Sequence, residues 1–167
     1  MDFVFRPPAA VLIVIGVVIV AAVASAFLKK GNTRRKITGI VITVVVGAVL
    51  LIVLYRPVTL TVDANGVRTT GLNPIELTWD EVDQAFLETD LTTSEFRPTV
   101  RTRGAAMGDY RTGRFMLSNG TRARVIMERS DLAVVLITND LTYLFAPDDI
   151  DGLIEAVDLY YPGAEQP

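Results

Sequence analysis

The chain has neither cysteine nor histidine among its 167 residues. Without cysteine it can form no disulfide framework and can supply no thiolate nucleophile. Without histidine it lacks the side chain that most often serves as a general base and as a metal ligand. We therefore expect a protein that is not an enzyme and that has no metal site and no cofactor.

Charged residues are segregated along the chain, although the formal net charge is only −3. Residues 97–129 contain eight arginines and two acidic residues, whereas residues 57–96 contain one arginine and eight acidic residues. Residues 130–167 contain eight acidic residues and no basic one. One arginine-rich block thus lies between acidic flanks. This pattern fits either an anion-binding surface or solvated strand faces that neighbouring acids neutralise.

Two apolar runs occupy the first third of the chain, after an N-terminal lead at residues 1–8. The basic loop 29–36 separates the runs, and it contains five Lys or Arg residues and no acidic one. As helices, residues 9–28 and 37–56 are each long enough to cross a hydrocarbon core of about 30 Å. The sequence predicts a transmembrane hairpin in the cell membrane. The positive-inside rule places the loop in the cytoplasm and the remaining residues outside.

Small residues in these two runs have alternative interpretations. Ala24 and Ala26 fit a signal-peptide cleavage site, but the apolar run is longer than usual for such a peptide, so a retained anchor is favoured. Gly39, Thr43 and Gly47 recur every fourth residue, which lets helix backbones approach closely. Packing of the two helices on each other explains this spacing, and a dimerisation face is the alternative.

From residue 57 the pattern changes to short β-type runs separated by turns. A hairpin is expected at residues 59–70, where Asn65-Gly66 supplies a strong turn signal. Residues 104–113 are rich in glycine and are expected to form a loop. A second hairpin is expected at residues 114–127, and the almost unbroken apolar run 132–138 predicts a central strand.

A helical period replaces the β pattern at residues 148–159. Acidic residues stand at the start of this segment, where the helix dipole favours them. The apolar stripe consists of Ile150, Leu153, Ile154 and Val157. This stripe needs an apolar surface to cover it, so we expect the helix to close the β structure before a short tail at residues 161–167.

Four stretches share a pattern of turns and core positions. They are Leu60-Thr61-Val62-Asp63-Ala64-Asn65-Gly66-Val67, Leu77-Thr78-Trp79-Asp80-Glu81-Val82, Arg103-Gly104 through Gly108-Asp109-Tyr110-Arg111-Thr112-Gly113-Arg114-Phe115, and Leu144-Phe145-Ala146-Pro147-Asp148-Asp149-Ile150. In these stretches, nearly all of residues 58–160 resemble a bacterial pleckstrin homology (PH) domain of the membrane-anchored kind. The resemblance implies that residues 57–160 form a mainly-β domain of about seven strands in two near-orthogonal sheets, capped by the C-terminal helix, that binds partners and is not an enzyme. Phosphoinositide-binding members use several basic residues around the first hairpin. Here that hairpin offers only Arg68, which counts against inositide binding.

The arginine block supplies the candidate ligand-binding residues, which are Arg101, Arg103, Arg111, Arg114, Arg122 and Arg124. Arg101 and Arg103 share a parity, as do Arg122 and Arg124, so each pair is expected on one face of its strand. If the strands are neighbours, they form a surface suited to carboxylate or phosphate groups. The favoured alternative is that these arginines pair with acids of flanking strands.

Other candidate sites have less support. Asp80, Glu81 and Asp83 resemble a carboxylate cluster, but neighbouring acids on a strand alternate faces, and a solvated edge explains them better. Ser118 belongs to a turn and has no base beside it in the sequence. Nucleic acid is a poor candidate ligand because few aromatic residues lie among the arginines.

The sequence as a whole predicts a two-helix transmembrane hairpin followed by a mainly-β PH-like domain. We expect it to act as a binding or assembly module that presents this domain to a protein or peptide partner at the membrane surface. Strand addition along a sheet edge is one mode for such a partner. The alternative function is a sensor of anionic lipid headgroups or small anions that uses the arginine face.

Overall fold

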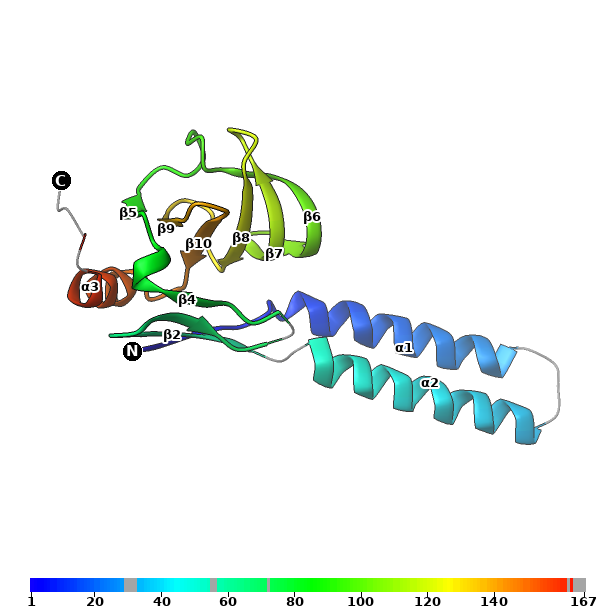
Figure 1. Ribbon diagram of the computed structural model, residues 1–167. Helices are drawn as coiled ribbons and strands as arrows, with labels where there is room; N and C mark the ends of the chain where they lie inside the picture. Colours follow the sequence, from blue (N-terminus) through cyan, green and yellow to red (C-terminus); the bar gives the residue numbers. More distant parts are fainter. Residues whose placement is uncertain (29–32, 55–56, 72, 162, 164–167) are drawn as a thin grey trace. The chain divides into compact units, whose positions relative to one another are not determined.

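The computed structural model describes residues 1–28, 33–54, 57–71, 73–161 and 163 (Figure 1). Its strands are β1 (Asp2–Phe5), β2 (Val58–Asp63), β3 (Gly66–Thr69), β4 (Glu76–Thr78), β5 (Gln84–Glu88), β6 (Pro98–Met107), β7 (Tyr110–Leu117), β8 (Arg122–Met127), β9 (Ala133–Ile137) and β10 (Thr142–Ala146). Its helices are α1 (Ala10–Leu28), α2 (Thr33–Leu54), α3 (Ile150–Tyr160) and the short 3-10 helix η1 (Trp79–Glu81). The chain divides into two compact units, a β unit of Met1–Phe5 with Pro57–Pro167 and a helical unit of Arg6–Arg56.

The helical unit consists of α1 and α2, which lie side by side (Figure 1). Gly47 of α2 is buried, and a Cβ atom there would come within 2.5 Å of the Ile19 side chain of α1. A glycine at this position therefore lets the two helices pack closely. This contact agrees with the interpretation that the small residues serve packing within the hairpin.

The described residues contain no helix that is both long enough and apolar enough to cross a membrane. A single helical span needs about 20 consecutive apolar residues. This finding contradicts the predicted transmembrane hairpin and, with it, the multi-pass localisation in the cell membrane. Half of the expected basic loop, residues 29–32, lies outside the described residues, and α2 begins at Thr33.

A four-stranded antiparallel sheet with the order β1-β2-β3-β4 forms one layer of the β unit. Its first strand comes from the N-terminal segment, which the sequence analysis treats as a lead. Phe3 and Phe5 of β1 are buried, whereas Val4 between them is exposed. This period-2 alternation is the local signal of a half-buried strand. The N-terminal segment is thus part of the β unit and pairs with β2, although residues 6–56 separate the two strands in the sequence.

The six-stranded sheet has the order β5-β9-β10-β8-β7-β6. Its neighbours are antiparallel except β8 and β10, which pair in parallel. The apolar run expected to form a central strand becomes β9, between β5 and β10, so that prediction is confirmed. The mainly-β domain with a C-terminal helix is also confirmed, with ten strands among the described residues where about seven were expected.

Two apolar clusters cover the two faces of the six-stranded sheet. One cluster combines β1, β2 and α3 with Val134 and Leu136 of β9. The other combines Ala133 and Val135 of β9 with Leu91 and the ring of Phe96 in the segment that follows β5. Because successive residues of a strand point to opposite faces, β9 contributes to both clusters and is buried throughout most of its length.

Helix α3 is held on the first cluster by its predicted apolar stripe. Ile150, Leu153 and Val157 are buried. Asp149 caps the helix, since its carboxylate accepts a hydrogen bond from the Gly152 backbone N–H at 3.1 Å. After the helix, the Tyr161 ring packs against Trp79 with a centroid separation of 5.6 Å. These contacts attach the end of the chain to the β structure.

Residues 104–113, expected to form a loop, are instead the paired ends of β6 and β7. Gly104 lies directly opposite Gly113 in this ladder, and both have positive φ, at 115° and 126°. A Cβ atom at either position would come within about 2.2 Å of a carbonyl oxygen on the opposite strand. Glycine here marks a close approach of two strands, which a glycine-rich sequence does not distinguish from a loop.

Replacing Phe5 tests whether β1 is an integral part of the core. Phe5 is 0% exposed and Val4 is 45% exposed. We expect Phe5→Ala to lower the free energy of unfolding by about 3–5 kcal/mol, since it removes a fully buried ring. The control Val4→Ala should cost less than about 1 kcal/mol. Urea denaturation of both variants measures the difference, and equal losses would contradict the burial of β1.

Replacing Gly113 tests the close approach of β6 and β7. Gly113→Ala should lower the free energy of unfolding by about 2–4 kcal/mol, because the new Cβ collides with the backbone of β6. Gly108 is the matched control, since it also has positive φ, but a Cβ atom added there would meet no atom within 4 Å. We expect Gly108→Ala to cost about 1 kcal/mol. A loss at Gly113 no larger than that at Gly108 would refute this explanation.

Candidate functional site

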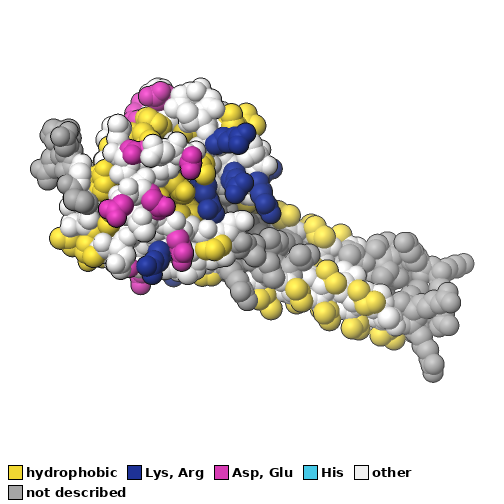
Figure 2. Space-filling model, viewed as in Figure 1, with side chains coloured by type: hydrophobic (Ala, Val, Ile, Leu, Met, Phe, Trp, Pro, Cys, Tyr) yellow, Lys and Arg dark blue, Asp and Glu magenta, His cyan; other side chains and the backbone are white. Residues whose placement is uncertain are grey.

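Three arginines form a row across neighbouring strands of the six-stranded sheet. Arg103 of β6 lies opposite Arg114 of β7, and Arg114 lies opposite Arg124 of β8. Directly opposite residues share a face of the sheet, with their Cβ atoms about 4.5–5.5 Å apart. We call these three residues the arginine row. Figure 2 shows basic side chains gathered over this part of the β unit.

The other three predicted site residues take different positions. Arg122 lies two residues before Arg124, opposite Met116, and shares the face of the arginine row. Arg101 lies opposite Phe115, which is on the other face of the sheet from Arg114. The prediction that Arg101 and Arg103 share a face is therefore wrong, because a register shift lies between them in β6. Arg111 lies opposite the buried Met127 on the other face and donates a hydrogen bond to the Pro98 carbonyl at 3.3 Å. The structure therefore brings four of the six arginines onto one face.

Acidic residues do not neutralise the arginine row in the part of the chain that the structure describes. One ion pair among the described residues joins Arg129 to Asp131 at 2.8 Å. Two hydrogen bonds from Arg129 hold the pKa of Asp131 at about 2. This pair lies outside the row, so the row retains its positive charge, unlike the neutralised strand faces that the sequence analysis favoured.

Arg124 is the structurally fixed member of the row. Its guanidinium donates hydrogen bonds to the carbonyl oxygens of Asn73 at 2.7 Å and Pro74 at 3.3 Å, in the connection between β3 and β4. Partial burial lowers the pKa of Arg124; the neighbouring Tyr143 opposes this effect, and the charge of Arg114 adds to it. Arg103 and Arg114 are exposed and remain accessible to a ligand.

Strand β6 is an edge of the six-stranded sheet and borders the arginine row. Every residue from Thr99 to Met107 is exposed, whereas Pro98 at its start is buried. One side of β6 pairs with β7. Among the described residues, no strand pairs with its other side, and an edge of this kind presents unpaired backbone N–H and C=O groups.

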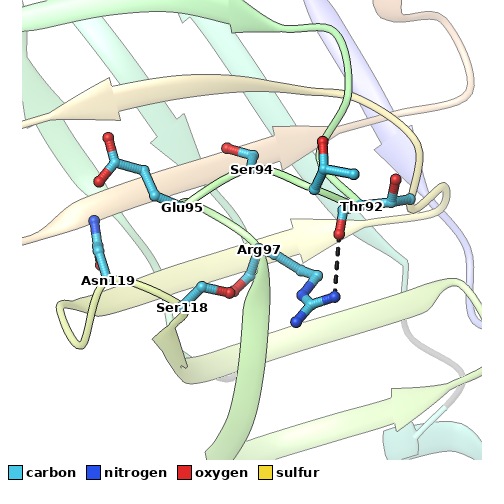
Figure 3. A pocket seen from close by; sticks show the side chains of 7 residues that line it. Thr92, Ser94, Glu95, Arg97, Ser118 and Asn119 are labelled. Atoms are coloured by element: carbon cyan, nitrogen blue, oxygen red, sulfur yellow. Dashed lines mark hydrogen bonds between the residues drawn. The ribbon is translucent and has the colours of Figure 1, made fainter.

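An open surface pocket lies between the segment after β5 and the turn that joins β7 to β8 (Figure 3). Its lining residues are Thr92, Thr93, Ser94, Glu95, Arg97, Ser118 and Asn119. The polar groups here bind one another: Arg97 donates to the Thr92 carbonyl at 3.1 Å, and the Ser118 hydroxyl donates to the Arg97 carbonyl at 3.3 Å. These bonds fix the two segments together, so Ser118 has a structural explanation.

The acidic residues near Trp79 also have a structural explanation. The Glu81 carboxylate accepts hydrogen bonds from the Thr78 backbone N–H at 2.9 Å and hydroxyl at 3.1 Å, which caps η1. Asp80 and Asp83 are exposed. Among the described residues, no three potential metal ligands of the His, Cys, Asp or Glu type lie together.

Fold and site together show a mainly-β domain with a basic sheet face beside an edge strand. Residues 89–159 match the family described as Bacterial PH domain. The match covers β6 to β10 and nearly all of α3, including the arginine row, and it supports the PH-like character of this domain. PH domains are typically binding modules without catalytic activity. No curated protein and no solved structure matched the chain.

Replacing Arg114 tests whether the arginine row is electrostatically unfavourable in the free protein. Like charges directly opposite each other destabilise a strand pair, so Arg114→Gln should raise the free energy of unfolding by about 0.2–1 kcal/mol at low salt. The gain should shrink at about 1 M salt, where charges are screened. Arg129→Gln is the control, because it removes a favourable ion pair and should not stabilise. Destabilisation by Arg114→Gln at low salt would show that an attractive contact holds Arg114.

Proposed function

We propose that this chain is a non-catalytic binding module whose partner is a protein or peptide segment that adds as a strand along β6. The carrying observation is that β6 is an edge strand of ten residues with nine consecutive exposed residues, Thr99–Met107. A partner strand would satisfy the backbone groups on the open side of β6. The match to the bacterial PH family supports a binding role without naming the partner.

Comparison of the sheet edges favours β6 as the docking strand. The opposite edge of the same sheet, β5, has five residues, and Ala85 and Phe86 within it are partly buried. The edges of the four-stranded sheet, β1 and β4, have four and three residues. A typical strand has about 5–6 residues, so β6 alone among these edges exceeds the length that a partner strand needs.

An anionic lipid headgroup or a small anion is the second candidate ligand, and the arginine row is the observation that favours it. Guanidinium groups bind carboxylate and phosphate groups through paired hydrogen bonds. However, the row lies on an extended strand surface, and it borders an edge that only a chain in extended conformation can complete. The peptide partner therefore explains both features, whereas an anion alone explains one.

Peptide selection followed by hydrogen exchange tests this function. Random ten-residue peptides displayed on phage would be selected on the purified full-length chain. We expect binding peptides, and with a selected peptide bound we expect slower amide exchange in β6, because new ladder hydrogen bonds protect its outward amides. The amides of β5 serve as the internal control and should be unchanged. Failure to select any peptide, or protection that spares β6, would overturn the proposal.

A further inference from the structure

We infer that the partner strand is acidic, with carboxylate side chains at alternate positions that bind the arginine row. This inference rests on the strand addition proposed above and specifies the chemistry of the partner. It draws on the register of β6, β7 and β8, on the absence of neutralising acids among the described residues near the row, and on the charge of β6 itself.

The register determines which partner side chains reach the arginines. An added strand would lie about 4.8 Å from β6, and alternate residues of that strand would point to the face that carries Arg103. The partner residue opposite Arg103 would extend the row by one position, with Arg114 one strand further in. Long side chains such as Glu reach both the directly opposite position and its diagonal neighbours.

The charge of the row specifies carboxylates on this face of the partner. Arg103 and Arg114 are exposed, and the described acidic residues form no ion pair with them. An Asp or Glu opposite Arg103 would replace a repulsive arrangement of neighbouring cations by an attractive one. The planar guanidinium also pairs with a carboxylate through two parallel hydrogen bonds, which adds geometric selectivity.

The same charges disfavour a second copy of this chain as the occupant. If two β6 strands paired edge to edge, Arg101 and Arg103 of one copy would approach the same arginines of the other. Like charges across a strand pair are destabilising, and charged residues on an edge strand oppose this kind of self-association. A partner strand of opposite charge avoids this repulsion and can pair with β6.

Three capped ten-residue peptides separate charge from strand formation. The first alternates Glu and Thr, the second alternates Gln and Thr, and the third alternates Glu and Pro, so it keeps the charge but cannot donate a full ladder. Each peptide is titrated by fluorescence anisotropy into the full-length wild-type chain, into the double variant R103Q/R114Q and into the control R68Q/R129Q. The control removes the same charge from positions outside the row.

We expect the Glu-Thr peptide to bind the wild-type chain about tenfold more tightly than the Gln-Thr peptide, and R103Q/R114Q to lose about tenfold. R68Q/R129Q should stay within about twofold of the wild-type chain. The preference for Glu should decline as salt rises. Circular dichroism of each variant confirms that the fold is retained.

The possible failures are distinguishable. Equal binding of the Glu-Thr and Gln-Thr peptides would overturn the acidic partner and leave strand addition in place. Equal binding of the Glu-Thr and Glu-Pro peptides would overturn strand addition, and binding of neither Thr peptide would overturn both. Phosphatidylglycerol vesicles that bind through Arg103 and Arg114 and displace the Glu-Thr peptide would also overturn the acidic peptide partner. So would a dimer of the wild-type chain that R103Q/R114Q weakens, because the arginines would then hold a second copy instead of opposing it.

Discussion

Burial of both faces of β9 is the constraint on which the rest of the β unit depends. Its residues alternate between the two apolar clusters, so the six-stranded sheet must be covered on each side of this strand. The four-stranded sheet and α3 supply one cover, and the segment after β5 supplies the other. Both N-terminal β1 and C-terminal α3 belong to the first cover, which explains why residues from both ends of the sequence share one core.

One cross-strand row shows how this core gives way to the candidate binding surface. From β5 to β6 the directly opposite residues are Ala85, Leu136, Tyr143, Arg124, Arg114 and Arg103. Along this line of opposite residues the side chains change from apolar through the amphipathic Tyr143 to cationic. Tyr143 and Arg124 lie at the boundary, where a ring and a partly buried guanidinium can each place an apolar part inward and a polar end outward.

The glycine pair in β6 and β7 links this architecture to the proposed binding edge. Gly104 and Gly113 permit a close approach that side chains would block, and β6 can therefore continue to Met107 instead of ending near Arg103. A long edge strand would ordinarily invite self-association. In the proposed mode of binding, the arginines on and beside β6 oppose pairing between identical copies and favour a strand of opposite charge.

The sequence by itself determined the elements whose signals are local. These are the hairpin around Asn65-Gly66, the buried strand β9, the apolar stripe of α3 and the presence of an arginine-rich block, because turn preference, periodicity and composition act over a few residues. Tertiary structure decided the pairing of β1 with β2, the parallel pairing of β8 with β10, the extension of β6 through its glycines and the alignment of Arg103, Arg114 and Arg124. It also contradicted the transmembrane hairpin inferred from apolar length alone. Strand register and neighbour order depend on contacts between distant residues, which parity along a single strand cannot specify.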